Sequence, residues 1–220
     1  MRREITGFSN PLLREIRGLR EKKLRKRAGL FLAEGLRIMT EAREAGFLPE
    51  MLFRVKDRPL HDLEVTLEVE VLANDGDVIE TSADIMAKLS GKDNAQVVVG
   101  VYRDHGTALA DVDRSTAPIW LVAQSMRDPG NLGTMLRTGD AVGAGGLILI
   151  DDCTDPFSVE SVRASMGAIF TQKIVQCRWE EFTAWLRSGP GQLVGTSLQT
   201  DTDYQAARYS APCFILTGNE

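Results

Sequence analysis

The chain has 220 residues, 43% of them hydrophobic and 26% charged, which is the composition of an ordinary globular protein. No apolar run approaches the ~20 residues of a membrane span, and the N-terminus lacks the apolar core of a secretory signal, so we expect a cytoplasmic protein without a membrane partner. Three widely separated cysteines have no metal-ligand spacing, and only two histidines are present. We therefore expect no metal site and no Ser-His-Asp catalysis.

The net charge of −5 hides a basic N-terminus, because residues 1–30 hold ten Lys or Arg against three Glu. Apolar residues recur at helical spacing over 10–28, which predicts one helix with a dense basic face. Such a face is either simply solvated or the footprint of a nucleic-acid partner. If the partner is RNA, the candidate binding residues are Arg20, Lys22, Lys23, Arg25, Lys26 and Arg27.

The rest of the first half alternates helices and strands. The capping pair Thr81 and Ser82 indicates a helix start. Turn formers and charges over 104–117, without an apolar face, are typical of a linker. The elements expected before this linker are helices over 36–46 and 82–91 and strands over 50–55, 69–74 and 95–103.

The second half alternates more regularly, and its strands are nearly all apolar. Apolar strands separated by amphipathic helices predict a parallel sheet covered on both faces, so the fold class is α/β. Besides a small helix after Asp128, the sequence predicts strands over 118–124, 146–151, 173–177, 192–198 and 213–218, and helices over 158–170, 180–188 and about 203–209.

The glycine-rich stretch 127–146 is the most unusual part of the sequence. Its last glycines precede a strand, so they do not form a dinucleotide fingerprint, and no Walker lysine is present. Residues 128–130, Asp-Pro-Gly, predict a tight turn at the carboxyl end of a strand, where open α/β sheets bind ligands. Asn131 is then either an ordinary N-cap or a site residue. Arg137 is either a surface residue or reaches a substrate phosphate.

Taken together, these segments resemble one known family. DPGNLGTMLRTGDAVGAGGLILID, from Asp128, resembles the first signature of the SpoU (TrmH-type) RNA ribose methyltransferases of the SPOUT superfamily, whose α/β fold is trefoil-knotted. DPFSVESVRASMGAIF resembles the segment that follows it, and FILTGNE the start of the second signature. Residues 10–42 resemble the L30e-like substrate-binding domain often fused ahead of it. The resemblance implies an RNA-binding domain over 1–103, a linker over 104–117 and a methyltransferase domain with a mainly parallel sheet over 118–220.

The resemblance also implies an activity, the S-adenosylmethionine-dependent methylation of a ribose 2′-hydroxyl, in ribosomal RNA rather than transfer RNA, by a homodimer. Arg137 matches the family's proposed catalytic residue, Asn131 its companion, and Glu220 the glutamate of the second signature. A guanidinium does not easily lose its proton, so we expect Arg137 to clamp a phosphate and stabilise the developing alkoxide. Arg163 either faces the RNA or only packs its helix against the rest of the protein. The implied cofactor-binding residues are Thr196, Ser197, Leu198, Leu216, Thr217 and Gly218, although the stretch from 195 to 198 alone reads as a strand-end turn.

The sequence ends at Glu220, inside the second signature, whereas the family continues with a third signature that completes the knot. We therefore expect a methyltransferase domain truncated at its C-terminus, with an incomplete knot, cofactor pocket and dimer contact. Two alternatives stay open: a non-catalytic RNA-binding protein that retains the fold, and a methyltransferase that protects ribosomes from an antibiotic.

Overall fold

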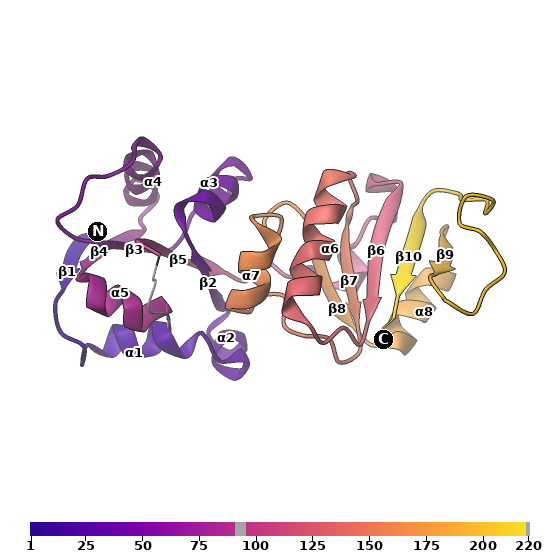
Figure 1. The fold of residues 1–220 in the computed structure, drawn as a ribbon, viewed down its shortest axis with the longest axis horizontal. Helices are drawn as coiled ribbons and strands as arrows, with labels where there is room; N and C mark the ends of the chain where they lie inside the picture. Colours follow the sequence, from indigo (N-terminus) through magenta and orange to yellow (C-terminus); the bar gives the residue numbers. More distant parts are fainter. Residues whose placement is uncertain (91–95, 219–220) are drawn as a thin grey trace.

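The computed structural model describes residues 1–90 and 96–218, and it contains two sheets that lie end to end along the molecule (Figure 1). The first half of the chain builds one sheet and the second half builds the other, each with helices against it. The α/β prediction is therefore confirmed.

The first sheet has the strand order β1-β4-β3-β5-β2, with β5 antiparallel to both β3 and β2. Two apolar layers enclose it, because strand side chains alternate between its faces. Leu52 joins α3 and α4 on one face, while Phe53 joins α1 and α5 on the other. The elements are β1 (Arg2–Ile5), α1 (Pro11–Gly18), α2 (Lys22–Ala28), β2 (Leu30–Glu34), α3 (Leu36–Glu44), β3 (Met51–Val55), α4 (Asp62–Ala73), β4 (Asp77–Thr81), α5 (Ala83–Ser90) and β5 (Val98–Arg103).

Two predictions for this half are wrong. The single helix over 10–28 is two helices, since a turn around the buried Leu19 separates α1 from α2. The strand expected over 69–74 lies inside α4, where Leu67 and Val71, one helical turn apart, are buried against the sheet. Its valines suggested a strand, but burial of a helical stripe outweighs the small cost of β-branched residues in a helix.

The second sheet has the order β8-β7-β6-β10-β9, and all of its strands are parallel, as predicted. Leu132 and Leu136 of α6 pack on one face, and Phe182 of α8 packs on the other with Trp120. The helix expected over 203–209 is only a turn. The elements are β6 (Ile119–Gln124), α6 (Pro129–Ala141), β7 (Gly146–Ile150), α7 (Val159–Ser165), β8 (Lys173–Cys177), α8 (Trp179–Arg187), β9 (Gln192–Gly195) and β10 (Cys213–Thr217), preceded by short 3-10 turns at Leu109–Asp111 and Arg114–Thr116.

An aromatic cluster joins the two halves. Phe31 of β2 lies 5.0 Å, between ring centroids, from Phe157, and Tyr102 of β5 lies 4.8 Å from Phe170. The His105 ring stacks on Phe170. Because these rings belong to one continuous apolar core, α7 holds the second sheet firmly against β2 of the first (Figure 1).

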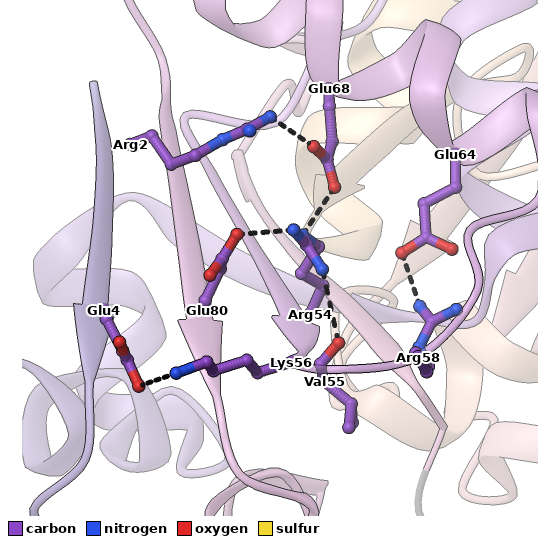
Figure 2. A network of polar contacts seen from close by, with 9 residues as sticks. All are labelled: Arg2, Glu4, Arg54, Val55, Lys56, Arg58, Glu64, Glu68 and Glu80. Carbon is purple, nitrogen blue, oxygen red and sulfur yellow. Dashed lines mark hydrogen bonds and ion pairs between the residues drawn. The ribbon is translucent and has the colours of Figure 1, made fainter.

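A buried ionic network lies on the outer part of the first sheet (Figure 2). The Glu68 side chain is 3% exposed and sits between Arg2 and Arg54: its Oε2 lies 2.7 Å from a guanidinium nitrogen of Arg2, and its Oε1 lies 2.7 Å from Nε of Arg54. Arg54 also pairs with Glu80. Burial raises the pKa of the Glu68 carboxyl, and the two arginines oppose this shift only in part. Ionisation of Glu68 is thus easier in the unfolded chain than in the folded one.

We expect Glu68→Gln to reveal this penalty through pH. The folded-state pKa of Glu68 is raised, so the stability that its neutral form contributes is present below about pH 4 and is lost as pH rises through the raised pKa. The free energy of unfolding of the wild type, relative to that of Glu68→Gln, should therefore fall as pH rises above about 4. Urea titrations of both proteins over this range measure the difference. A difference that is constant or grows with pH would contradict this interpretation.

Candidate functional site

A hollow of about 420 Å³ opens at the carboxyl edge of the second sheet, where β6 and β10 end side by side. Open parallel sheets bind ligands at this edge, because the loops that leave neighbouring strands converge there. The start of α6 forms one wall and the end of β10 the other. Its lining includes Asp128, Asn131, Thr134, Met135, Thr217 and Gly218.

The N-terminus of α6 is capped by Asp128, and the N-cap alternative for Asn131 is therefore wrong. The Asp128 carboxylate accepts the backbone N–H of Asn131 at 2.6 Å, and Pro129 occupies the first helical position. A carboxylate before a proline is a favourable start for a helix. The Asn131 amide side chain is exposed and makes no hydrogen bond with the described residues, so it is available at the hollow.

Arg137 lines a different hollow, of about 490 Å³, between α6, α7 and α3. Arg137 follows Asn131 by six positions on the helix, which corresponds to ~9 Å along the axis and about 120° around it. Thr134 lies between them and borders both hollows. One helix thus presents the predicted pair to adjoining hollows, and the structure does not bring both side chains into one.

The cofactor candidates fall into four environments. Thr217 and Gly218 line the hollow beside Asn131, and Thr196 and Ser197 line a third hollow of about 580 Å³ at the end of β9. Leu216 packs on the core of the second sheet, and its carbonyl accepts the Thr196 N–H at 2.9 Å. The fully exposed Leu198 lines neither hollow. Glu220 lies outside the described residues.

The two hollows at this edge suit a nucleoside that carries a polar tail. The hollow at the end of β9 has a mostly apolar lining that includes Tyr204 and Tyr209, and aromatic and aliphatic walls accept a flat ring. A Cβ at Gly218 would meet nothing within 4 Å, so the backbone there is open to a ligand. The donor set therefore fits S-adenosylmethionine better than an inorganic ion.

Other reactive groups are scarce around this edge. Burial raises the pKa of the Cys177 thiol to about 11, so it stays protonated at neutral pH. His105 lies away from this edge, in the aromatic cluster between the two halves, where one ring nitrogen is 2.8 Å from the Ile169 carbonyl oxygen. Within the described ranges there is no cluster of three or more metal-ligating side chains, and no helix there has the length and apolar character to cross a membrane.

The structure corrects the expected role of Arg25. Its guanidinium is buried and donates to the Asp155 carboxylate at 2.7 Å and to the Leu19 carbonyl at 2.7 Å. An arginine enclosed in this way does not reach a phosphate. Arg20 and Arg163, both partly exposed, converge on the buried Glu34. These contacts join α2 and β2 of the first half to the second.

Four of the basic residues remain exposed on α2: Lys22, Lys23, Lys26 and Arg27. The helix lies at the lower edge of Figure 1, as do the carboxyl ends of β6 and β10. Asp152 accepts a hydrogen bond from Arg127 at 2.6 Å, which lowers the pKa of the Asp152 carboxyl, and the charge of Lys22 is close enough to add to this shift. Since Arg127 borders the hollow with Asn131, the exposed face of α2 continues toward it.

Three residues of these hollows were not identified as site residues from the sequence. Asp128 carried a usable signal, because Asp before Pro is a strong helix start. Thr134 sits one helical turn from both Asn131 and Arg137, so their spacing could have indicated it. Arg37, from the first half of the chain, carried no local signal, because only the packing of α3 near α6 places it beside Arg137.

Comparisons with known proteins agree with this geometry. Residues 10–100 match the MRM3-like substrate binding domain, and residues 118–220 match the SpoU rRNA Methylase family. The chain is 34% identical to an rRNA methyltransferase of Sinorhizobium meliloti whose crystal structure superposes with a TM-score of 0.91, covering 100% of this chain and 82% of the other. A second structure from that organism has AdoMet bound and gives a TM-score of 0.89. The chain is also 28% identical to a 23S rRNA guanosine 2′-O-methyltransferase of Bacillus subtilis, over 99% of this chain and 83% of that protein.

Proposed function

The chain belongs to the SpoU rRNA methylase family, and we propose that it transfers a methyl group from S-adenosylmethionine to a ribose 2′-hydroxyl of ribosomal RNA. One observation supports this proposal most directly. At one edge of the second sheet, the Asn131 side chain, which has no hydrogen-bond partner among the described residues, lines the same hollow as Thr217 and Gly218, and the backbone at Gly218 is open to a ligand.

Bound S-adenosylmethionine would supply an electrophilic methyl group on its sulfonium. The chain itself has to orient the ribose hydroxyl in line with that group, and such alignment supplies much of the rate enhancement of a methyl transfer. Thr217 and Gly218, with Thr196 and Ser197 of the adjoining loop, would hold the cofactor. Asn131 can donate to or accept from a ribose hydroxyl, because its amide has no other hydrogen-bond partner among the described residues.

Arg137 stabilises the negative charge that develops on the RNA. A guanidinium offers five N–H donors and no acceptor, so Arg137 acts as a hydrogen-bond donor and not as the base. Among the described residues it forms no ion pair, and it is exposed at the hollow next to Asn131. There it would bind the phosphate beside the target ribose in a bidentate manner.

The exposed basic residues of α2 supply RNA affinity. We expect the replacement of Lys22, Lys23, Lys26 and Arg27 by Gln to weaken RNA binding and to lower its salt dependence by ~0.7 to 0.9 log units per lost phosphate contact. Filter binding at several salt concentrations measures both quantities. Stability should barely change, because exposed charges contribute little to it.

The matched control for these replacements is Arg14→Gln combined with Arg17→Gln, because both residues are exposed on the neighbouring helix α1. If the salt dependence of RNA binding is unchanged in the α2 variant, or if the α1 control loses as much RNA affinity, the basic face of α2 is only solvated and does not bind RNA.

We also propose that the protein acts as a homodimer in the cytoplasm. Its substrate is ribosomal RNA rather than transfer RNA. The names of the relatives, which are rRNA methyltransferases, support the choice of RNA. The test is a map of ribose methylation across the ribosomal and transfer RNA of a strain that lacks the gene. Loss of one ribosomal site, restored by the wild type but not by Asn131→Ala, is the expected result; an unchanged ribosomal map would contradict the proposal.

A further inference from the structure

The hollow between α3 and α6 contains two arginines that come from different halves of the molecule. Arg37 lies on α3, near its start, and Arg137 lies on α6. Both are exposed, and within the part of the chain that the structure describes neither forms an ion pair or a side-chain hydrogen bond. By contrast, Arg20, Arg25 and Arg163, at the same junction, are all paired with carboxylates.

The hollow is held in shape by close packing of its walls. Gly167, after α7, has φ +106°, and a Cβ there would lie 2.5 Å from the Cβ of Glu41 on α3. The Arg163–Glu34 pair and the Phe31–Phe157 contact join the same elements. Arg37 and Arg137 are therefore positioned relative to each other by a firm junction and not by a loose linker.

The rest of the lining combines small apolar residues with carboxylates and hydroxyls. Asp140 accepts the Thr171 hydroxyl at 2.6 Å, and Glu41 borders the hollow from α3. Two guanidiniums next to two carboxylates would not favour a free multivalent anion. They suit a chain that alternates phosphates with hydroxyl donors, because carboxylates accept from the ribose 2′-OH. The volume of about 490 Å³ is in the range of a nucleotide-sized ligand.

We propose that this hollow holds the RNA backbone next to the methylated ribose, and that Arg37 is a second phosphate ligand there, supplied by the N-terminal half. The inference rests on the proposed function. The junction of the two halves then has a role in substrate binding, because a phosphate bound by Arg37 fixes the position of the RNA relative to Arg137.

Arg37→Gln tests the proposal, with purified 23S rRNA as the probe. We expect the Kd for RNA to rise ~10-fold at ~0.1 M salt and the salt slope to fall by ~0.7 to 0.9 log units, as for one lost phosphate contact. The single-turnover rate at saturating RNA should fall much less than in Arg137→Lys, because Arg37 binds the backbone and not the reacting atoms. Arg37→Lys should restore most of the slope, since it keeps the charge.

Arg43→Gln is the matched control, because Arg43 lies on the same helix but pairs with Glu70 of α4 at 2.7 Å. Its RNA affinity and slope should equal those of the wild type. A normal Kd and slope for Arg37→Gln, or the same loss in Arg43→Gln, would overturn the inference. If the wild type bound RNA with this Arg37 dependence but transferred no methyl group, the proposed function would fail while the RNA contact stood.

Discussion

Replacement of Arg137 by Lys is expected to lower the single-turnover rate of methyl transfer at least ~100-fold, the usual scale for the loss of a major transition-state donor. Lysine keeps one positive charge but loses the planar, bidentate guanidinium, so both phosphate clamping and alkoxide stabilisation should suffer. Saturating RNA is essential in this assay, because weak binding would otherwise appear as slow chemistry.

Cofactor affinity and melting temperature should hardly change in Arg137→Lys, because the side chain is exposed and lies outside the hollows at the cofactor edge. Arg178→Lys is the control, since this exposed arginine pairs with Glu181 on the surface near α8. A near-normal rate for Arg137→Lys would mean that position 137 supplies only charge, and the role assigned to it would be wrong.

Arg25→Met is expected to lower the free energy of unfolding by ~3–5 kcal/mol, because it leaves the Asp155 carboxylate buried without its charge partner. Both side chains of the pair are less than 10% exposed, so little water can replace the lost contact. The Leu19 carbonyl also loses its donor. Urea unfolding followed by fluorescence measures the change.

Lys26→Met serves as the control for Arg25→Met, since the next residue on α2 is exposed and should change stability by less than ~0.5 kcal/mol. The order of the two variants should reverse for RNA binding, where Lys26→Met has the larger effect. Folded Arg25→Met is expected to keep its RNA affinity, whereas Lys26→Met is expected to weaken it. A cost below ~1 kcal/mol for Arg25→Met would mean that the pair behaves like an exposed surface bridge.

The local sequence pattern was sufficient to predict most of the strands and helices of the second half. Its strands are nearly all apolar and its helices are amphipathic, so both signals agreed with a parallel sheet. The first half carried weaker signals. The polar β1, at the edge of its sheet, has no apolar alternation, and the valines of α4 indicated a strand although their burial follows a helical stripe.

The candidate site was only partly predictable for a geometric reason. The motif identified Asn131 and Arg137 as a pair, but their angular separation on α6 sends them to adjoining hollows. Arg25 belonged to a basic stretch that suggested RNA contacts, and its partner Asp155 lies 130 residues away in the sequence. No local pattern shows which charge of a basic helix will be buried by the other half of the chain.

The central claim is that the methyl group goes to a ribose oxygen of ribosomal RNA, and the position of a labelled methyl tests it most directly. The purified protein is incubated with 23S rRNA and S-adenosylmethionine labelled in its methyl group, and the RNA is then hydrolysed in alkali. A 2′-O-methyl group blocks cleavage of the adjacent linkage, because the attacking hydroxyl is gone. We predict label in one alkali-resistant dinucleotide, greatly diminished with Arg137→Lys. Label that appears only in mononucleotides, as methylated bases would give, or no label in the RNA, would contradict the account.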